Sequence, residues 1–477
     1  MANIKARTGP GEQSKLNSYL GLAPTASKAV ARAEKTGATQ AEAFALRRVI
    51  SACFIERLQV TFAQRKVQSG LGIRVAMGKK LGFSCTSNLS EKPMNETIEK
   101  ALRTARAREE DPRFKAFPAK GTYQKVRGIS DKQVRNAQIE ELIDKGRTLA
   151  EAMRNYDKRV ESGSGTITYI TYNRAIANSA GVDLEETETL VDARVSSMAK
   201  GDGDVSGVDY LQLARNSSDV DVEQLGKTVS KLCVDQLARK PIETRSMDLV
   251  LHSYAVGDLF AHTIHPAFMG DNLQRNKTPF AGKLGKKILS DLISIEDNGV
   301  IEKGFASQSF DDEGNPRKNT RLIEKGVINS FLYDSLWANQ ANTKSTGNST
   351  RKDVTGLRTY SSEPIIETSN IVVRPGTKDL EKLISEVEDG VLAYTVIGAH
   401  TSNQVSGAFS IGVQTAFKIE GGEIKYPVKE AMIGSDIVQL LRNVNEVGND
   451  VRTYEDELRH RVTITPSIRF SNVKISA

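Results

Sequence analysis

The chain has 477 residues, of which 39% are hydrophobic and 26% charged, a composition typical of globular proteins that excludes a mainly disordered chain. No run approaches the roughly eighteen apolar residues of a membrane-spanning helix, and the first residues lack the apolar segment of a signal peptide. The formal net charge is +7 and no basic block concentrates it, so nucleic-acid binding is permitted but not indicated.

The N-terminal half alternates between helical and strand patterns. Residues 1–22 are polar and interrupted by Gly and Pro, so we expect a flexible lead. Helical periodicity or strong helix formers cover 26–35, 95–108, 137–155 and 220–238. Alternating apolar residues predict strands over 41–48, 50–64, 70–77, 81–86 and 158–181, with 41–48 and 50–64 paired and a hairpin turn at Gly78. A mixed α/β domain is therefore predicted over residues 23–240.

The second half has a different character. Pro241 ends the preceding helix, and residues 240–244 form a plausible link between domains. A short buried strand over 247–251 and a helix over 253–268 precede strands and turns, including hairpin signals at 324–327 and 420–423. We therefore predict an α+β protein of two domains, with a β-rich C-terminal domain over 241–477.

Three of the five histidines fall close together in the sequence, at His252, His262 and His265. His262 and His265 are three residues apart, so a helix brings both to one face, as a metal site requires. No Glu accompanies them, and Pro266 bends or ends the helix, so hydrogen-bonded core histidines are the competing interpretation. The three cysteines, Cys53, Cys85 and Cys233, lie far apart, which favours a reducing, cytoplasmic environment.

Two polar segments of the C-terminal half are candidate binding loops. Residues 311–317 hold three carboxylates, but their turn-forming neighbours favour a solvated turn. Residues 344–351 are polar and centred on a glycine. Ser345, Thr346, Gly347 and Asn348 offer hydroxyls, amides and close backbone approach to a peptide, although a mobile surface loop without a role is the alternative.

The order of several segments resembles the TldD/PmbA family, the so-called modulators of DNA gyrase. The matching segments are 71–75, 82–83, 304–314, 322–332, 344–348, 406–410, 420–428 and 447–450. The resemblance implies a cytoplasmic two-domain protein that pairs with a relative to form a peptidase chamber. In such pairs the TldD-like chain holds zinc through His-Glu-x-x-x-His and a later Cys, and the PmbA-like (TldE-like) chain does not.

This chain departs from the zinc pattern at most of its positions. Gly257 and Asp258 stand where the first His and the Glu are expected, His262 matches the second His, and no Cys follows Cys233. The resemblance thus implies a PmbA-like member without a catalytic residue or cofactor of its own, whose TldD-like partner carries the zinc.

The leading hypothesis is a subunit that supplies chamber wall and a surface for unfolded peptides. The expected assembly is a homodimer or a heterodimer with a TldD-like chain, without a membrane or nucleic-acid partner. One alternative is a self-sufficient metallopeptidase that uses His262 and His265, with His252 or Asp258 as a further ligand. The other is a non-enzymatic regulator that binds nucleic acid or a DNA-topology enzyme.

Overall fold

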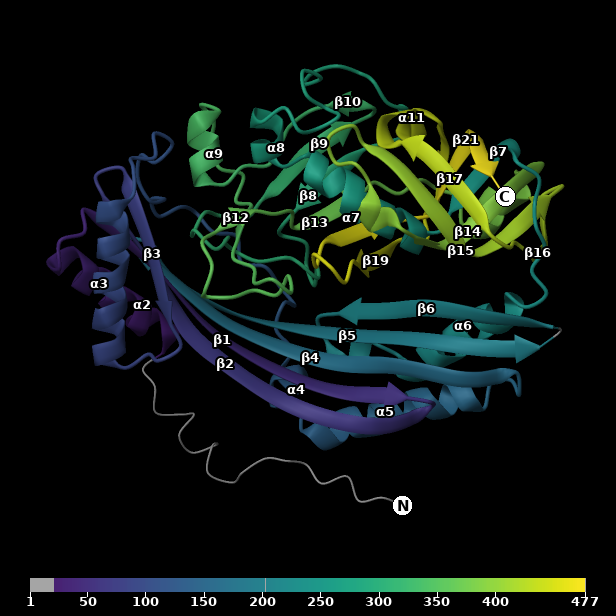
Figure 1. The fold of residues 1–477 in the computed structure, drawn as a ribbon, viewed down its shortest axis with the longest axis horizontal. Helices are drawn as coiled ribbons and strands as arrows, with labels where there is room; N and C mark the ends of the chain where they lie inside the picture. Colours follow the sequence, from purple (N-terminus) through teal and green to yellow (C-terminus); the bar gives the residue numbers. More distant parts are fainter. Residues whose placement is uncertain (1–20, 202, 477) are drawn as a thin grey trace.

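A computed structural model describes residues 21–201 and 203–476. The lead predicted over 1–22 lies outside the described residues except for Gly21 and Leu22, which cap and begin the first described helix, α2 (Leu22–Lys35). The described chain combines antiparallel and mixed sheets with separate helices, so the predicted α+β class is confirmed (Figure 1).

A long, curved, antiparallel sheet forms the N-terminal half (Figure 1). Its strands are β1 (Gln40–Glu56), β2 (Gln59–Met77), β3 (Lys80–Thr86), β4 (Val160–Asn178), β5 (Asp183–Gly201) and β6 (Asp204–Ala214), in the order β3-β2-β1-β4-β5-β6. The predicted division into strands 41–48 and 50–64 is wrong, because β1 continues unbroken to Glu56. The chain reverses at Arg57 and Leu58, which have φ of 50° and 61°. Sequence rules expect Gly or Asn at such positions, so the turn was missed.

The two faces of this sheet meet different partners. On β1, Ala43 and Ala45 pack against α2 and α3 (Glu91–Ala107), whereas Phe44 and Leu46 face the other way. Further along the same face, α5 (Ile139–Arg154) and α6 (Val222–Asp235) cover Cys53 and its neighbours. The opposite face is turned toward the C-terminal half, so any site between the halves lies on it (Figure 1).

The C-terminal half contains two larger sheets. One has the order β14-β7-β21-β17-β15-β16, and an additional β14–β15 pairing closes it into a barrel; β18 pairs with β21. The second has the order β10-β9-β8-β13-β20-β19, and β11 pairs with β12. The strands are β7 (Arg245–Leu251), β8 (Ile295–Asn298), β9 (Asn319–Glu324), β10 (Val327–Ile328), β11 (Ser349–Thr350), β12 (Ile365–Ile366), β13 (Asn370–Val373), β14 (Asp389–Ile397), β15 (Ala408–Glu420), β16 (Glu423–Pro427), β17 (Ala431–Asp436), β18 (Val444–Val447), β19 (Arg452–Glu455), β20 (Val462–Thr465) and β21 (Ile468–Ser476).

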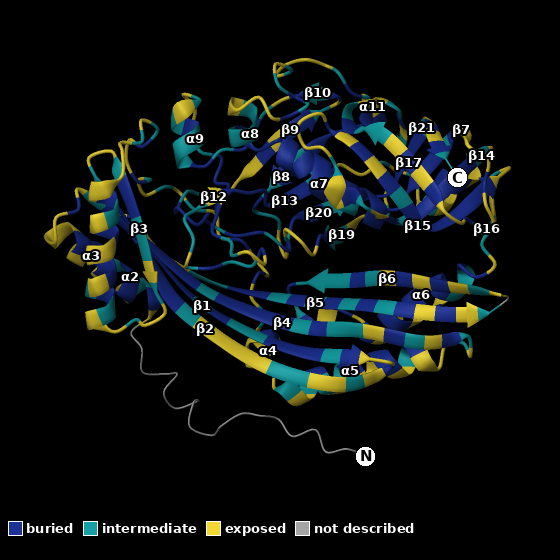
Figure 2. Ribbon diagram, viewed as in Figure 1, coloured by how far each residue is buried: buried dark blue, intermediate teal, exposed yellow. Residues whose placement is uncertain are grey.

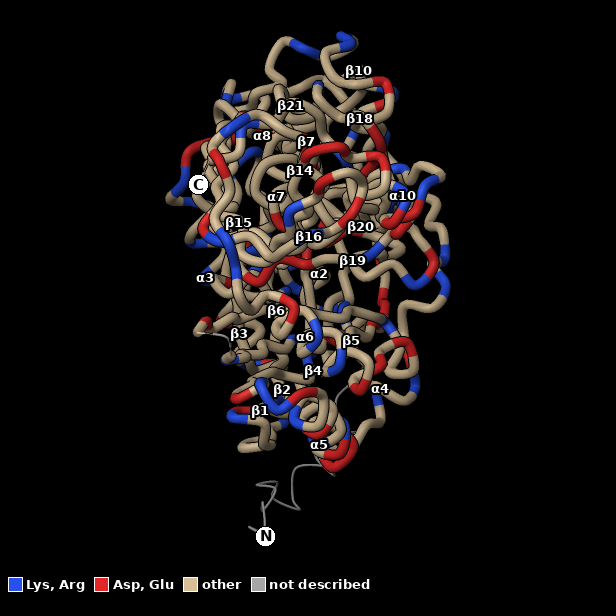
Figure 3. The backbone as a smooth tube through the Cα atoms, turned by 90° about the vertical axis from the view of Figure 1, so that its right-hand side faces the viewer, with Lys and Arg blue, Asp and Glu red and all other residues tan. Residues whose placement is uncertain are grey.

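The remaining helices are mostly short. They are α4 (Lys132–Asn136), η1 (Ser217–Asp219), α7 (Ser253–Ala267), α8 (Gly270–Gln274), α9 (Ser335–Gln340), α10 (Leu380–Ser385), η2 (Ala399–Thr401) and α11 (Ile437–Arg442). Helix α7 lies within the largest apolar core, against β14, β19 and β20 (Figure 2). In the part of the chain that the structure describes, no helix has the length and apolar character needed to cross a bilayer. Basic and acidic residues are interspersed along the chain in the view of Figure 3.

Candidate functional site

Helix α7 carries the residues that the family resemblance singles out. It begins after His252, whose Nδ1 accepts a hydrogen bond from the backbone N–H of Tyr254 at 3.3 Å. Every residue of α7 is buried except Asp258, as expected of a helix that is apolar nearly all round. The partly exposed Asp258 therefore marks where the helix meets open space.

That space is a cavity of about 610 Å³ between the curved sheet and the C-terminal half. Asp258 and His262 line it from α7, and β1, β4, β5 and β6 contribute the opposite wall. Its lining includes Tyr210, Tyr254 and Tyr454, with ring centroids 4.4 Å apart for the first two and 6.2 Å for Tyr254 and Tyr454. A cavity of this size with aromatic walls and a few polar groups suits a peptide side chain or a small organic ligand.

Gly257 approaches Tyr454 too closely to be replaced by a larger residue. A Cβ atom at position 257 would lie 2.5 Å from Tyr454 Cβ and 2.6 Å from Tyr454 Cγ. The Tyr454 ring, held on β19, therefore occupies the direction in which a side chain at position 257 would project. A histidine at 257 is incompatible with this packing, so the zinc pattern is absent in space as well as in sequence.

His262 is the one member of the histidine trio that lines the cavity. Its Nε2 lies 3.7 Å from Asp258 Oδ1 and 3.7 Å from Asp456 Oδ1, and its ring is 6.3 Å from that of His400. Burial lowers the pKa of His262 and the charge of Asp456 partly opposes this, so the imidazole is neutral at pH 7.

The carboxyl group of Asp258 is partly protonated near pH 7. Burial raises the pKa of Asp258 to about 7; its hydrogen bond with Tyr454 opposes this shift and the charge of Asp456 adds to it. A half-protonated carboxyl is a weak metal ligand. Over residues 21–201 and 203–476, no group of three His, Cys, Asp or Glu side chains is positioned to hold a metal ion. The residues present therefore do not fit a catalytic zinc, which takes three protein ligands.

His265 and His252 lie in separate environments. The ring nitrogens of His265 are each within hydrogen-bond distance of a hydroxyl, Thr368 Oγ1 at 2.6 Å and Thr463 Oγ1 at 3.0 Å, and burial holds its pKa well below 6.5. His252 stacks between Tyr254 and Tyr394, and burial lowers its pKa to about 3. The fold thus does not bring the three histidines together.

The segment predicted to bind peptide, Ser345–Thr346–Gly347–Asn348, is packed into the C-terminal half. Ser345 Oγ and Thr346 Oγ1 donate to Tyr333 O at 3.0 and 3.2 Å, and Asn348 Nδ2 donates to Asp297 Oδ2 at 2.7 Å. These contacts argue against the alternative of a mobile surface loop, because most of the polar groups of the segment are bonded within the chain. Peptide binding here stays a prediction without supporting geometry.

The turn at residues 311–317 is also buried, which corrects the expectation of a solvated turn. Asp311 Oδ1 accepts from the backbone N–H groups of Glu313 and Asn315, so the turn itself was anticipated. However, Asp311, Asp312 and Glu313 are at most 1% exposed. Arg174 of β4 pairs with Asp312 and Arg74 of β2 pairs with Glu313. These pairs belong to a network that also comprises Glu42, Glu186, Glu188, Arg215, Arg351 and Arg358. In the sequence, this network is signalled only by charged residues within the strands of the sheet.

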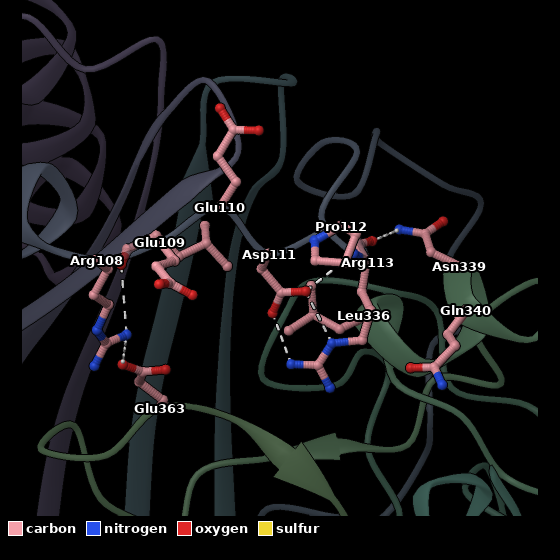
Figure 4. A pocket seen from close by; sticks show the side chains of 11 residues that line it. Arg108, Glu109, Glu110, Asp111, Pro112, Arg113, Leu336, Asn339, Gln340 and Glu363 are labelled. Atoms are coloured by element: carbon pink, nitrogen blue, oxygen red, sulfur yellow. Dashed lines mark hydrogen bonds and ion pairs between the residues drawn. The ribbon is translucent and has the colours of Figure 1, made fainter.

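A second hollow, of about 860 Å³, lies between residues 108–113 and α9 (Figure 4). Its charges are largely paired: Asp111 with Arg113 at 2.7 Å and Arg108 with Glu363 at 3.0 Å. Glu110 points away from these pairs. Among the described residues, the hollow holds no group of three His, Cys, Asp or Glu side chains positioned to bind a metal ion, and the α7 cavity remains the candidate site.

Comparisons with known proteins identify the family of the chain. Models of the PmbA/TldA metallopeptidase match domain 1 to residues 41–108, the central domain to 132–237 and the C-terminal domain to 244–477. The crystal structure of TldE from Thermococcus kodakarensis superposes with a TM-score of 0.86 and 26% identity, covering 94% of this chain and 99% of that one. A Thermotoga maritima structure described as a DNA gyrase modulator, at 24% identity, shares the fold with a TM-score of 0.84 over 94% of this chain and 98% of its own.

Curated proteins of similar sequence include members of the same family. Metalloprotease PmbA of Escherichia coli O157:H7 is 25% identical over 398 residues, covering 80% of this chain and 81% of the relative. An uncharacterized protein of Methanocaldococcus jannaschii is 28% identical over 420 residues, covering 85% and 89%. Because the three domain models follow one another along most of the sequence, the chain belongs to the PmbA/TldD metallopeptidase family.

Proposed function

We propose that this chain is a PmbA-like (TldE-like) subunit of a cytoplasmic peptidase and carries no catalytic zinc. It supplies chamber wall and a peptide-binding cavity, while a TldD-like partner holds the zinc and performs hydrolysis. The observation that carries the proposal is the packing of Tyr454 against Gly257, which excludes a ligand at the first position of the zinc motif.

The α7 cavity supports the peptide-binding part of this function. Its volume of about 610 Å³ and its tyrosine walls suit side chains of an unfolded peptide. Asp258, His262 and Asp456 supply polar groups on one side. In this function they orient substrate by hydrogen bonding, and none of them activates water.

The two alternatives have less support. A self-sufficient metallopeptidase using His262 and His265 would need both rings at one ion, yet both nitrogens of His265 are within bonding distance of hydroxyls. A regulator that binds nucleic acid would need a basic face, whereas the net charge of +7 is spread over 477 residues.

Metal analysis and activity together test the proposal. The isolated chain should contain no stoichiometric zinc, and mixing it with a TldD-like relative should produce peptidase activity with zinc at about one per TldD-like chain. His262→Ala in this chain should leave the complex able to hydrolyse unfolded peptide. One zinc per chain in the isolated protein, lost in His262→Ala, would refute it.

A further inference from the structure

Arg317 differs from the other buried arginines. Within residues 21–201 and 203–476, eight arginines are buried, and seven of them have a carboxylate oxygen within 4.0 Å. Arg317 is 5% exposed and has none. A buried cation without an anion is costly unless something else compensates its charge.

The hydrogen bonds of Arg317 are also incomplete. Its Nη2 donates only to neutral oxygens, Gln308 Oε1 at 3.5 Å and Thr350 Oγ1 at 3.3 Å. Its Nε and Nη1 are buried and have no partner. The guanidinium therefore retains two unsatisfied donors, each of which carries a desolvation penalty of about 1–3 kcal/mol.

The carboxylates of Asp311 and Asp297, whose charges act on Arg317, accept hydrogen bonds from other groups. Asp311 accepts from the backbone N–H groups of Glu313, Asn315 and Ser349. Asp297 accepts from Asn348 Nδ2 and from the backbone N–H and hydroxyl of Ser369. Burial lowers the pKa of Arg317, while the charges of Asp311 and Asp297 oppose the shift. The chain itself thus compensates this cation only in part.

Arg317 lines a cavity of about 100 Å³ between the curved sheet and the C-terminal half, together with Gln308 and Thr350. Its apolar walls are Ile170, Leu190, Phe305, Leu357 and Val462. This cavity is distinct from the α7 cavity, because the two share no lining residue. Its volume admits roughly one small amino-acid residue and excludes a folded or extended chain.

The other charged residues around this cavity have partners. The acidic ones pair with basic groups: Glu188 with Arg174, Arg215 and Arg358; Glu367 with Lys352 and Arg461; Glu455 with Arg194 and His460; and Asp192 with Arg194. Asp192 keeps one unpartnered oxygen. However, Asp192 lies four residues along β5 from Glu188, a separation of about 13 Å, and it is Glu188 that contacts Gln308 beside Arg317. The Arg317 end is therefore the end that attracts an anion.

We propose that Arg317 binds the α-carboxylate of a small aliphatic amino acid, either free or as the last residue of a short peptide. The carboxylate accepts charged hydrogen bonds from the Arg317 guanidinium that lines the cavity, and the aliphatic side chain packs against the apolar walls. This site rests on Arg317 and its cavity and is independent of the proposed function.

Binding to the full chain tests the site. Calorimetry and thermal denaturation would compare L-valine and N-acetyl-L-valine with N-acetyl-L-valinamide, which lacks the carboxylate, and with inorganic phosphate. At least one of the two acids should bind at least tenfold more tightly than the amide or phosphate. The same acid should raise the melting temperature of the chain. Preference for L-valine indicates a free amino acid, and preference for N-acetyl-L-valine indicates a peptide terminus.

Variants separate binding from folding. Arg317→Met should weaken acid binding at least tenfold without lowering the melting temperature, because it removes an unpaired buried charge. Arg321→Met, at an exposed position of β9, is the matched control and should bind as the parent does. The proposal fails if the parent binds neither acid, if amide or phosphate binds equally well, or if folded Arg317→Met still binds. Should Arg317→Met not fold, the comparison of acid with amide decides alone.

Discussion

Arg174 of β4 lies 3.3 Å from Asp312, measured from Nη1 to Oδ1, although the two residues are 138 positions apart in the sequence. Neither side chain has any exposed surface. Arg174 also pairs with Glu186 and Glu188 of β5. The ion pair thus joins the curved sheet to the 311–317 turn of the C-terminal half.

Further pairs extend this junction along the sheet. Arg74 of β2 bonds Glu42 of β1 at 2.8 Å and Glu313 of the turn at 3.0 Å. Arg351 also bonds Glu42. Because each charged residue of this network has an opposite charge beside it, the network favours one relative position of the two halves and disfavours others.

Breaking this network should be strongly destabilising. Arg174→Leu leaves Asp312, Glu186 and Glu188 short of a cation in a buried site, which costs about 3–5 kcal/mol. The exposed pair between Lys28 and Glu91 provides the control, since Lys28→Leu should change stability by less than about 1 kcal/mol. Chemical denaturation measures both, and a small loss for Arg174→Leu would contradict the structural role of the network.

Much of the fold could be predicted from the sequence because its signals are local. The helix predicted over 253–268 matches α7, and the hairpin signals at 324–327 and 420–423 match the β9–β10 and β15–β16 turns. These patterns depend on residues a few positions apart. The reversal at Arg57 and Leu58 was missed because neither residue is a usual turn former.

The site was less predictable because its contacts are long-range. The spacing of His262 and His265 placed both on one helix, but only the fold reveals that His265 is held by Thr368 and Thr463. Likewise, nothing near Gly257 in the sequence indicates that Tyr454 packs against it. Contacts between elements that lie one hundred to two hundred residues apart leave no periodic pattern in the sequence.

Adding a methyl group at Gly257 tests the packing on which the proposed function rests. Gly257→Ala should cost about 1–3 kcal/mol, because the new Cβ meets Tyr454 at 2.5 Å. The cost should shrink in a Tyr454→Ala background, which denaturation of the single and double variants measures. Gly434→Ala, where a Cβ meets nothing within 4 Å, should be nearly neutral. Equal costs in both backgrounds would disprove the contact.

Gly347 should also resist substitution, for a different reason. It has φ of 76°, and a Cβ would lie 2.3 Å from the carbonyl oxygen of Pro316. Gly181 has φ of 86° with nothing within 4 Å of its Cβ, so Gly181→Ala carries only the backbone cost of about 1–2 kcal/mol. Gly347→Ala should therefore lower the melting temperature well beyond Gly181→Ala. Equal melting temperatures would restore the interpretation of 344–351 as a loose loop.

The chain should form a dimer, either with itself or with a TldD-like relative. A chamber wall must bury a large surface between subunits, and obligate interfaces exceed about 2,000 Å². Light scattering at micromolar concentration should give about twice the 52.2 kDa of one chain, for the chain alone or for its mixture with the relative. A mass of 52.2 kDa, unchanged when the relative is added, would contradict the expected assembly.

Asp258 should make stability fall as the pH rises toward neutrality. Its pKa is raised from 3.8 to about 7 in the folded chain, so the folded state binds this proton more tightly than the unfolded state. The stabilisation is complete below pH 4 and lost as the pH passes 7, and at about 1.4 kcal/mol per pKa unit it amounts to at most about 4 kcal/mol. The melting temperature of the parent minus that of Asp258→Asn should therefore decrease from pH 5 to pH 8. Asp183→Asn, at an exposed position, is the control and should show no such trend. If the difference for Asp258→Asn does not change with pH, the Asp258 carboxyl titrates alike in the folded and unfolded chains.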